Sequence, residues 1–186
     1  MNLKEMNKGL DFLRDKYGAA KEAITLKGVD ATPADTVITG GETRQVLNIT
    51  SAAATVENLT LRDGLAAGSG TGAGYTLQMS GGLVTNCVIS GGEPVRAAFE
   101  TAVFATGGRI TGCEITGVLA DKTASTYGAY QRTPIYLKNA TMDHCDIHGN
   151  FSTHKYLGLV TVEGANGLVE FCKIHDNSLK GFEYGY

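Results

Sequence analysis

The chain has no tryptophan, only three prolines and no long apolar run among its 186 residues. Because a membrane-spanning helix needs about 20 consecutive apolar residues, membrane insertion by a helix is excluded. The net charge is −3 at pH 7 and no basic stripe is present, so nothing in the sequence attracts nucleic acid or an anionic membrane. The first seven residues also lack the apolar segment of a secretory signal peptide.

Glycine, by contrast, is abundant, and a nine-residue phrase occurs five times. The 25 glycines suit a chain with many tight turns. Copies of the phrase span 56–64, 84–92, 110–118, 142–150 and 169–177, and their fourth residues are separated by 28, 26, 32 and 27 positions. A period of this kind is typical of a solenoid, whose units stack to bury their apolar faces. The fourth residues form one column: Leu59, Cys87, Cys113, Cys145 and Cys172.

Within each phrase the apolar residues occupy positions one, four and six instead of alternating strictly. A shift of one residue moves side chains to the other face of a strand unless the chain turns, so a bend is predicted at position three. Asn58, Asn86 and Gly112 stand at this position and tolerate the left-handed backbone conformation that a tight bend needs. His144 and Phe171 stand there in the last two copies and fit less well.

A second alternating run precedes each phrase, for example Leu47 and Ile49, or Leu77 and Met79. Each coil is therefore predicted to contain three short parallel strands, joined by a bend, a tight turn and one longer loop. Like residues of successive coils should stack at about 4.8 Å, the spacing of paired strands. The prediction is an all-β domain, a parallel β-helix of about five to six coils.

This pattern resembles the right-handed parallel β-helix proteins, the superfamily of pectate lyases, tailspikes and autotransporter-type adhesins. The resemblance extends from about residue 23 to the C-terminus, with a weaker first coil at 24–28 and 36–41. The segment 36–64 looks like the opening coils of secreted bacterial β-helix proteins. The resemblance implies a secreted or cell-surface protein. Because no signal peptide is evident, we expect a fragment of a longer chain or an engineered start.

The two ends of the chain differ from the repeat. Residues 1–20 are predicted to form an amphipathic helix that caps the β-helix domain at 21–186, because the strands of a first coil would otherwise be exposed. An oligomer contact is the alternative use of this helix. For the C-terminal end there are three alternatives: the tail folds over the last coil, the native polypeptide is longer, or the open end mediates self-association. The helical stripe consists of Leu3, Met6, Leu10, Leu13, Tyr17 and Ala20.

The cysteine column is predicted to hold free, buried thiols. Successive rungs would place the outer two sulfur atoms about 14 Å apart, whereas a zinc site needs all four ligands within about 2.3 Å of one ion. Parallel side chains on neighbouring rungs also hold the Cβ atoms slightly too far apart for a disulfide. We therefore expect no metal or other cofactor, with cysteine acting as a small apolar residue in the slot that Leu59 fills elsewhere.

Two histidines are predicted to lie on the outer face of the third strand. His148 and His175 occupy the same place in the last two copies of the phrase. With nearby carboxylates they would suit zinc binding or acid–base chemistry. The alternative is a solvated ladder in which Asp146 pairs with Lys173 across rungs. The full candidate set is His148, His175, Asp143, Asp146 and, in the following loop, His154.

The longer loops, near 90–102, 116–134 and 148–159, are predicted to leave the same corner of the coil and form one surface. Aromatic rings with interspersed charges suit a polysaccharide or cell-surface glycan, since rings stack on sugar faces and charged groups bind hydroxyls or carboxylates. The alternative is that these rings pack onto the coil. The candidate ligand-binding residues are Arg96, Phe99, Tyr127, Tyr130, Arg132, Phe151 and Tyr156.

Catalysis has less support in the sequence than binding. Most glycoside hydrolases need two carboxylates about 5 Å or about 6.5–9.5 Å apart, and calcium takes six to eight oxygen ligands. The outer face of the first strand has no paired carboxylates, and no lyase motif is matched, so no catalytic residue is assigned. A polysaccharide lyase or glycoside hydrolase would have to use candidates at the loop corner or the histidine pair: Arg132, His154, Lys155, His148 and His175.

Three hypotheses of function follow from these observations. The first is a non-catalytic extracellular β-helix module for adhesion, surface display or glycan contact. The second is a polysaccharide-active enzyme that uses the loop corner. The third is a structural module that stacks end to end through its C-terminal end. The fold alone does not distinguish them, because one scaffold hosts unrelated functions.

Overall fold

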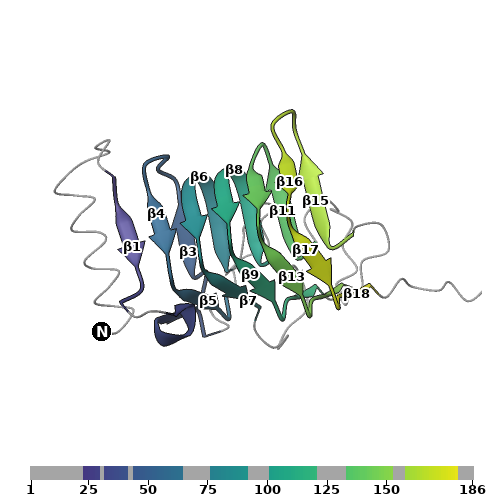
Figure 1. The fold of residues 1–186 in the computed structure, drawn as a ribbon, viewed down its shortest axis with the longest axis horizontal. Coiled ribbons are helices and arrows are strands. Elements are labelled where there is room, and N and C mark those ends of the chain that lie inside the picture. The colour runs from purple at the N-terminus through teal and green to yellow at the C-terminus, as the bar shows by residue number, and fades with distance from the viewer. Residues whose placement is uncertain are drawn as a thin grey trace, which may run out of the picture.

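The computed structural model describes residues 23–29, 32–41, 44–64, 76–91, 101–120, 133–152 and 158–179. These residues form an all-β domain, a parallel β-solenoid of about four turns. Figure 1 shows its strands stacked side by side from the N-terminal strand β1 (Thr25–Lys27) to the C-terminal end of the solenoid. The predicted capping helix at 1–20 lies outside the described residues. Within the described part, no helix is long and apolar enough to span a membrane.

The largest sheet of the described residues has nine strands and combines the first and second strands of each coil. In two coils these form one continuous strand, β6 (Leu77–Thr85) and β8 (Val103–Thr111), and the register between β6 and β8 shifts around Ser80. The other members of this sheet are β1, β3 (Leu47–Ile49), β4 (Thr55–Glu57), β11 (Ile135–Lys138), β12 (Thr141–Asp143), β15 (Val160–Glu163) and β16 (Leu168–Glu170).

The third strands of the coils form a separate six-stranded sheet. It consists of β2 (Val37–Thr39), β5 (Thr60–Arg62), β7 (Val88–Ser90), β9 (Glu114–Thr116), β13 (Asp146–His148) and β17 (Lys173–His175). A short sheet not expected from the sequence follows it, with β10 (Leu119–Ala120), β14 (Phe151–Ser152) and β18 (Ser178–Leu179). A single 3-10 turn, η1 (Pro33–Asp35), precedes β2 in the described residues.

Every strand pair among the described residues is parallel, as the repeat predicts. The six strands of the third sheet correspond to the five to six coils expected, while the complete turns number about four. Pairing also continues through the bends: the amide of Glu114 donates to the carbonyl of Cys87, and that of Asp146 donates to Cys113. Backbone groups that a bend would leave unpaired are thereby satisfied.

The core is a set of columns along the solenoid axis. In the third sheet, Leu61, Ile89, Ile115 and Ile147 are in register and have no exposed surface. Full burial of such a side chain contributes about 1.5–3 kcal/mol, so each rung is held mainly by the rungs on either side. Ile174 continues the column in register, but it is 52% exposed because it lies in the last described rung.

The bend predicted at position three is confirmed in all five copies. Asn58, Asn86, Gly112, His144 and Phe171 have φ values of 57°, 48°, 60°, 53° and 51°. The left-handed conformation therefore extends to His144 and to Phe171, and it is a bulky residue such as Phe171 that disfavours it. The position in the coil, set by the stacking of neighbouring rungs, overrides the local preference of Phe171.

Candidate functional site

The predicted loop surface falls largely outside the described residues. The candidate residues that lie outside the described part of the chain are Arg96, Phe99, Tyr127, Tyr130, Arg132, His154, Lys155 and Tyr156. Phe151 is described: it is half-buried at the start of β14, in register with Leu119 of the preceding rung and Ser178 of the following one. The carbohydrate-binding role of this surface therefore remains a prediction.

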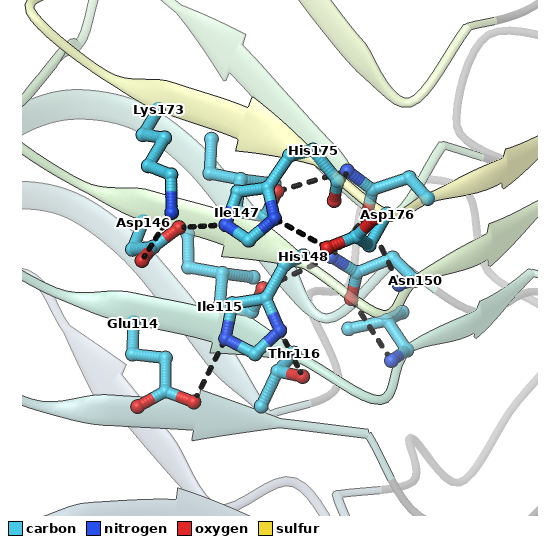
Figure 2. A network of polar contacts seen from close by, with 12 residues as sticks. Glu114, Ile115, Thr116, Asp146, Ile147, His148, Asn150, Lys173, His175 and Asp176 are labelled. Atoms are coloured by element: carbon cyan, nitrogen blue, oxygen red, sulfur yellow. Dashed lines mark hydrogen bonds and ion pairs between the residues drawn. The ribbon is translucent and has the colours of Figure 1, made fainter.

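The histidine pair lies on the outer face of the third sheet, as predicted. His148 of β13 and His175 of β17 are register partners, and their rings stack with centroids 5.3 Å apart and planes 21° apart. Figure 2 shows the two rings one above the other, with Glu114 and Asp146 on one side of them. We call this network the imidazole ladder; its members are Glu114, Thr116, Asp146, His148, Lys173, His175 and Asp176.

Each imidazole of the ladder reaches back to an acidic residue of the preceding rung. His148 Nε2 lies 3.1 Å from Glu114 Oε1, and its Nδ1 lies 3.5 Å from the hydroxyl of Thr116. His175 Nε2 lies 2.8 Å from Asp146 Oδ1, and its Nδ1 lies 2.7 Å from Asp176 Oδ2. The repetition arises because the strands pair in register, which places the third residue of one strand, His148 or His175, diagonal to the first residue of the preceding strand, Glu114 or Asp146.

Electrostatics in the ladder favour a charged His175. Its two carboxylate partners, Asp176 first and then Asp146, raise the pKa of His175 above its ordinary value. In return, His175 lowers the pKa of Asp176. The ammonium group of Lys173 lies 3.9 Å from Asp146 and adds the cross-rung ion pair expected from the sequence. These groups are solvent-exposed, so each pair contributes little to stability.

Asp143 does not join the histidines, contrary to the candidate set. It belongs to β12 in the largest sheet, where its side chain is buried and bound by three others. The guanidinium of Arg109 donates two hydrogen bonds to the Asp143 carboxylate, from Nε at 2.7 Å and from Nη2 at 3.1 Å. The hydroxyl of Thr111 donates to the same carboxylate at 2.5 Å, and His144 Nδ1 lies 2.8 Å from it. The bidentate contact with Arg109 is the main cause of a pKa far below the ordinary value for Asp143.

A pair of asparagines closes the third strand toward the short sheet. The side chain of Asn150, 1% exposed, donates to the carbonyl of Ile115 at 2.9 Å and accepts from the amide of Val118 at 3.0 Å. Asn177 repeats the first contact one rung later with the carbonyl of Ile147. The two amides also bond to each other at 3.0 Å. Both asparagines stand at the ninth position of the repeated phrase, and this shared position is the sequence signal that identifies them.

The cysteine column is confirmed. Cys87, Cys113 and Cys145 are buried free thiols, and Cys172 in the last described rung is half-buried. Each sulfur contacts two backbone carbonyls, for example Cys113 with Thr111 at 3.4 Å and Val84 at 3.8 Å. Contacts with the neighbouring thiols, Cys145 first, and burial raise the pKa of Cys113, which makes it an inert core residue. Among the described residues, no group of three or more His, Cys, Asp or Glu side chains is placed to hold a metal ion.

Aromatic residues also occupy the outer face of the first strand. Phe104 and Tyr136 stack with ring centroids 5.1 Å apart and planes 7° apart, and both are buried. The hydroxyl of Tyr136 donates to Glu163 at 2.7 Å. Burial, followed by this hydrogen bond, raises the pKa of Tyr136 to about 12. Alternation along the strand places these two rings on the outer face of the coil, but because both are buried they offer no exposed platform for a sugar.

Two exposed aromatic rings do occur, at the bend between the second and third strands. His144 and Phe171 have ring centroids 5.2 Å apart and planes tilted by 30°. In earlier rungs the same column holds Asn58 and Asn86, whose side chains share a hydrogen bond of 3.0 Å. The bend column therefore changes from amides to rings in the last two rungs.

Comparison with protein-family models, with curated proteins and with solved structures finds no match to this chain. The parallel β-solenoid is thus established by the structure, whereas the finer resemblance to pectate lyases or adhesins is a matter for proposal.

Proposed function

We propose that this chain is a non-catalytic β-solenoid module of a secreted or cell-surface protein, used for adhesion, surface display or glycan contact. One observation carries the proposal: the groups that could act as acid and base are bound to each other. Both ring nitrogens of His175 face carboxylates, from Asp146 and Asp176. Both ring nitrogens are engaged by these contacts, so neither can exchange a proton with a substrate while the contacts hold.

The carboxylates of the ladder support the same interpretation. Glu114 and Asp146 are register partners on adjacent rungs, so their strands lie about 4.8 Å apart, and two carboxylates on adjacent rungs are the kind of pair that a glycoside hydrolase uses. However, Glu114 is hydrogen-bonded to His148, and Asp146 to His175 and Lys173. A substrate would have to break these contacts to reach either acid. The ladder is therefore interpreted as a set of rung-to-rung links on an outer face.

A polysaccharide panel tests this proposal. The protein is incubated with neutral and acidic polysaccharides, with and without calcium, and binding, reducing ends and the absorbance of unsaturated products are recorded together. The expected result is binding of at least one polysaccharide with no release of product in either condition. Calcium-dependent release of unsaturated uronates, or release of reducing ends, would contradict a non-catalytic role.

A second candidate, a module that stacks end to end, is favoured by the last described rung. Val162 and Ile174, which continue inward-facing columns, are 43% and 52% exposed, whereas Leu137 and Ile147 one rung earlier are completely buried. Exposed apolar side chains beside the edge strands β15 and β17 are suited to contact with a rung of a second copy of this chain, whose cross-section is the same. The C-terminal end is thus the proposed place of self-association.

A further inference from the structure

The strongest unexplained feature is the column of exposed rings at the bend, which we call the aromatic edge: His144 and Phe171. Phe171 has a φ of 51° and is 75% exposed, so it adopts a strained backbone conformation without gaining burial. Asn58, Asn86 and Gly112 show that the bend itself needs no ring. The aromatic residues are therefore not required by the fold at this position.

The surroundings of the aromatic edge are polar and nearly neutral. Arg109 and Asp143 form a bidentate ion pair next to it, and Asp143 also holds the ring of His144 through Nδ1 at 2.8 Å. Glu170, in register with Asp143, directly precedes Phe171. His144 is thus oriented by a buried carboxylate, while Phe171, 75% exposed, directly follows an exposed carboxylate that can bind hydroxyls.

We propose that the aromatic edge is a binding site for the pyranose rings of a neutral glycan, with Phe171 as the stacking platform. A sugar ring covers one aromatic face and leaves its hydroxyls to polar neighbours such as Glu170 and His144. An acidic glycan fits less well, because Arg109 is already neutralised by Asp143. A protein partner fits less well too, since two rings supply a fraction of the roughly 800 Å² that each side of a standard interface buries.

This inference rests on the proposed glycan contact, and the bend column offers a variant that separates binding from stability. Phe171→Asn installs the residue type found at the same bend in earlier rungs, so the variant should unfold at the same denaturant concentration as the wild-type protein or higher. Its affinity for a neutral oligosaccharide should fall about tenfold, the upper end of one aromatic stacking contact. Phe171→Tyr keeps a ring and should keep the affinity. Thr85→Ala, three coils before Phe171 on the outer face of the largest sheet, is the matched control and should bind like the wild type.

The probes are xylo-, cello-, manno- and malto-oligosaccharides, titrated by calorimetry, with NMR of the aromatic side chains to locate the contact. The chain has four histidines, so ring signals of His144 can be assigned and should shift together with those of Phe171. If the wild-type protein binds an oligosaccharide and Phe171→Asn binds it equally well, the aromatic edge is not the site, although glycan contact stands. If the wild-type protein binds none of these neutral sugars, the aromatic edge is not a site for a neutral glycan, whereas glycan contact as such is decided by the acidic members of the polysaccharide panel. Loss of concentration-dependent association in Phe171→Asn without sugar binding would assign the edge to a second copy instead, which also overturns the inference.

Discussion

Replacement of Ile115 by alanine tests the assignment of inner and outer faces most directly. Ile115 has no exposed surface and lies in the third sheet between Ile89 and Ile147, which are equally buried. The strands above and below are held in register by backbone hydrogen bonds at about 4.8 Å, so the rungs cannot close over a vacated space. A cavity should therefore persist in the middle of the stack.

The expected loss is about 2–5 kcal/mol, the range for removing a large aliphatic side chain from a core that cannot collapse. Two variants calibrate this value. Thr116→Ala changes the next residue, on the outer face, where the hydroxyl makes only a 3.5 Å contact with His148 Nδ1, and should alter stability by less than about 0.5 kcal/mol. Ile174→Ala removes the same side chain from the same column, but this residue is 52% exposed, so its effect should be less than half that of Ile115→Ala.

Chemical denaturation followed by far-ultraviolet circular dichroism and by tyrosine fluorescence measures these differences. Coincident transitions are required, because a repeat protein can unfold in parts, and the slope with denaturant should stay constant among the variants. Equal midpoints for Ile115→Ala and Thr116→Ala would show that the two faces are wrongly assigned. An Ile174→Ala effect as large as that of Ile115→Ala would show instead that the last rung is covered.

Two further predictions concern charge and the end of the stack. The folded-state pKa of His175 is raised above 6.5, so this residue stabilises the fold fully below pH 6.5 and loses its contribution as the pH rises through the folded-state pKa. The difference in unfolding free energy between the wild type and His175→Ala should therefore be larger at pH 5.5 than at pH 9. A difference independent of pH would contradict the carboxylate contacts. If the C-terminal end mediates self-association, light scattering should show oligomers of the wild-type protein that dissociate in Ile174→Lys. The same oligomers should persist in Thr106→Lys, which places the new charge at an exposed position in the middle of the stack. A wild-type protein that is monomeric at all concentrations would refute end-to-end stacking.

The repeat predicts the backbone of this protein well because stacking imposes one conformation on equivalent positions. The bend at position three, the cysteine column and the aliphatic column of the third sheet all follow from aligning five copies of one phrase. Stacking even overrides residue preference, since Phe171 adopts the φ that Asn58 prefers. What the alignment lacks is the position of a copy in the stack, so it does not reveal that Ile174 is 52% exposed whereas Ile147 is completely buried.

Side-chain contacts between rungs were harder to predict than the backbone. Alternation places His148 and His175 on the outer face, but it does not reveal which acid each ring reaches. Asp143 was grouped with them because it is near in sequence, whereas the bend at His144 turns it onto a different sheet beside Arg109. The partner of a long side chain depends on a diagonal offset between rungs that a one-dimensional alignment does not contain.

The asparagine pair provides a last test of how the coils are joined. Asn150→Ala should leave the buried amide of Val118 and the carbonyl of Ile115 without their side-chain partner, at about 1–3 kcal/mol for each buried group that no water reaches. Asn177→Ala, in the half-buried last rung, should cost less because solvent can replace its amide. Hydrogen exchange gives the direct measurement: protection of the Val118 amide should fall in Asn150→Ala and persist in Asn177→Ala. If that amide stays protected in Asn150→Ala, the side chain of Asn150 does not hold the third strand to the short sheet. The connection between the two sheets then depends on the backbone pairing of β10 with β14 alone.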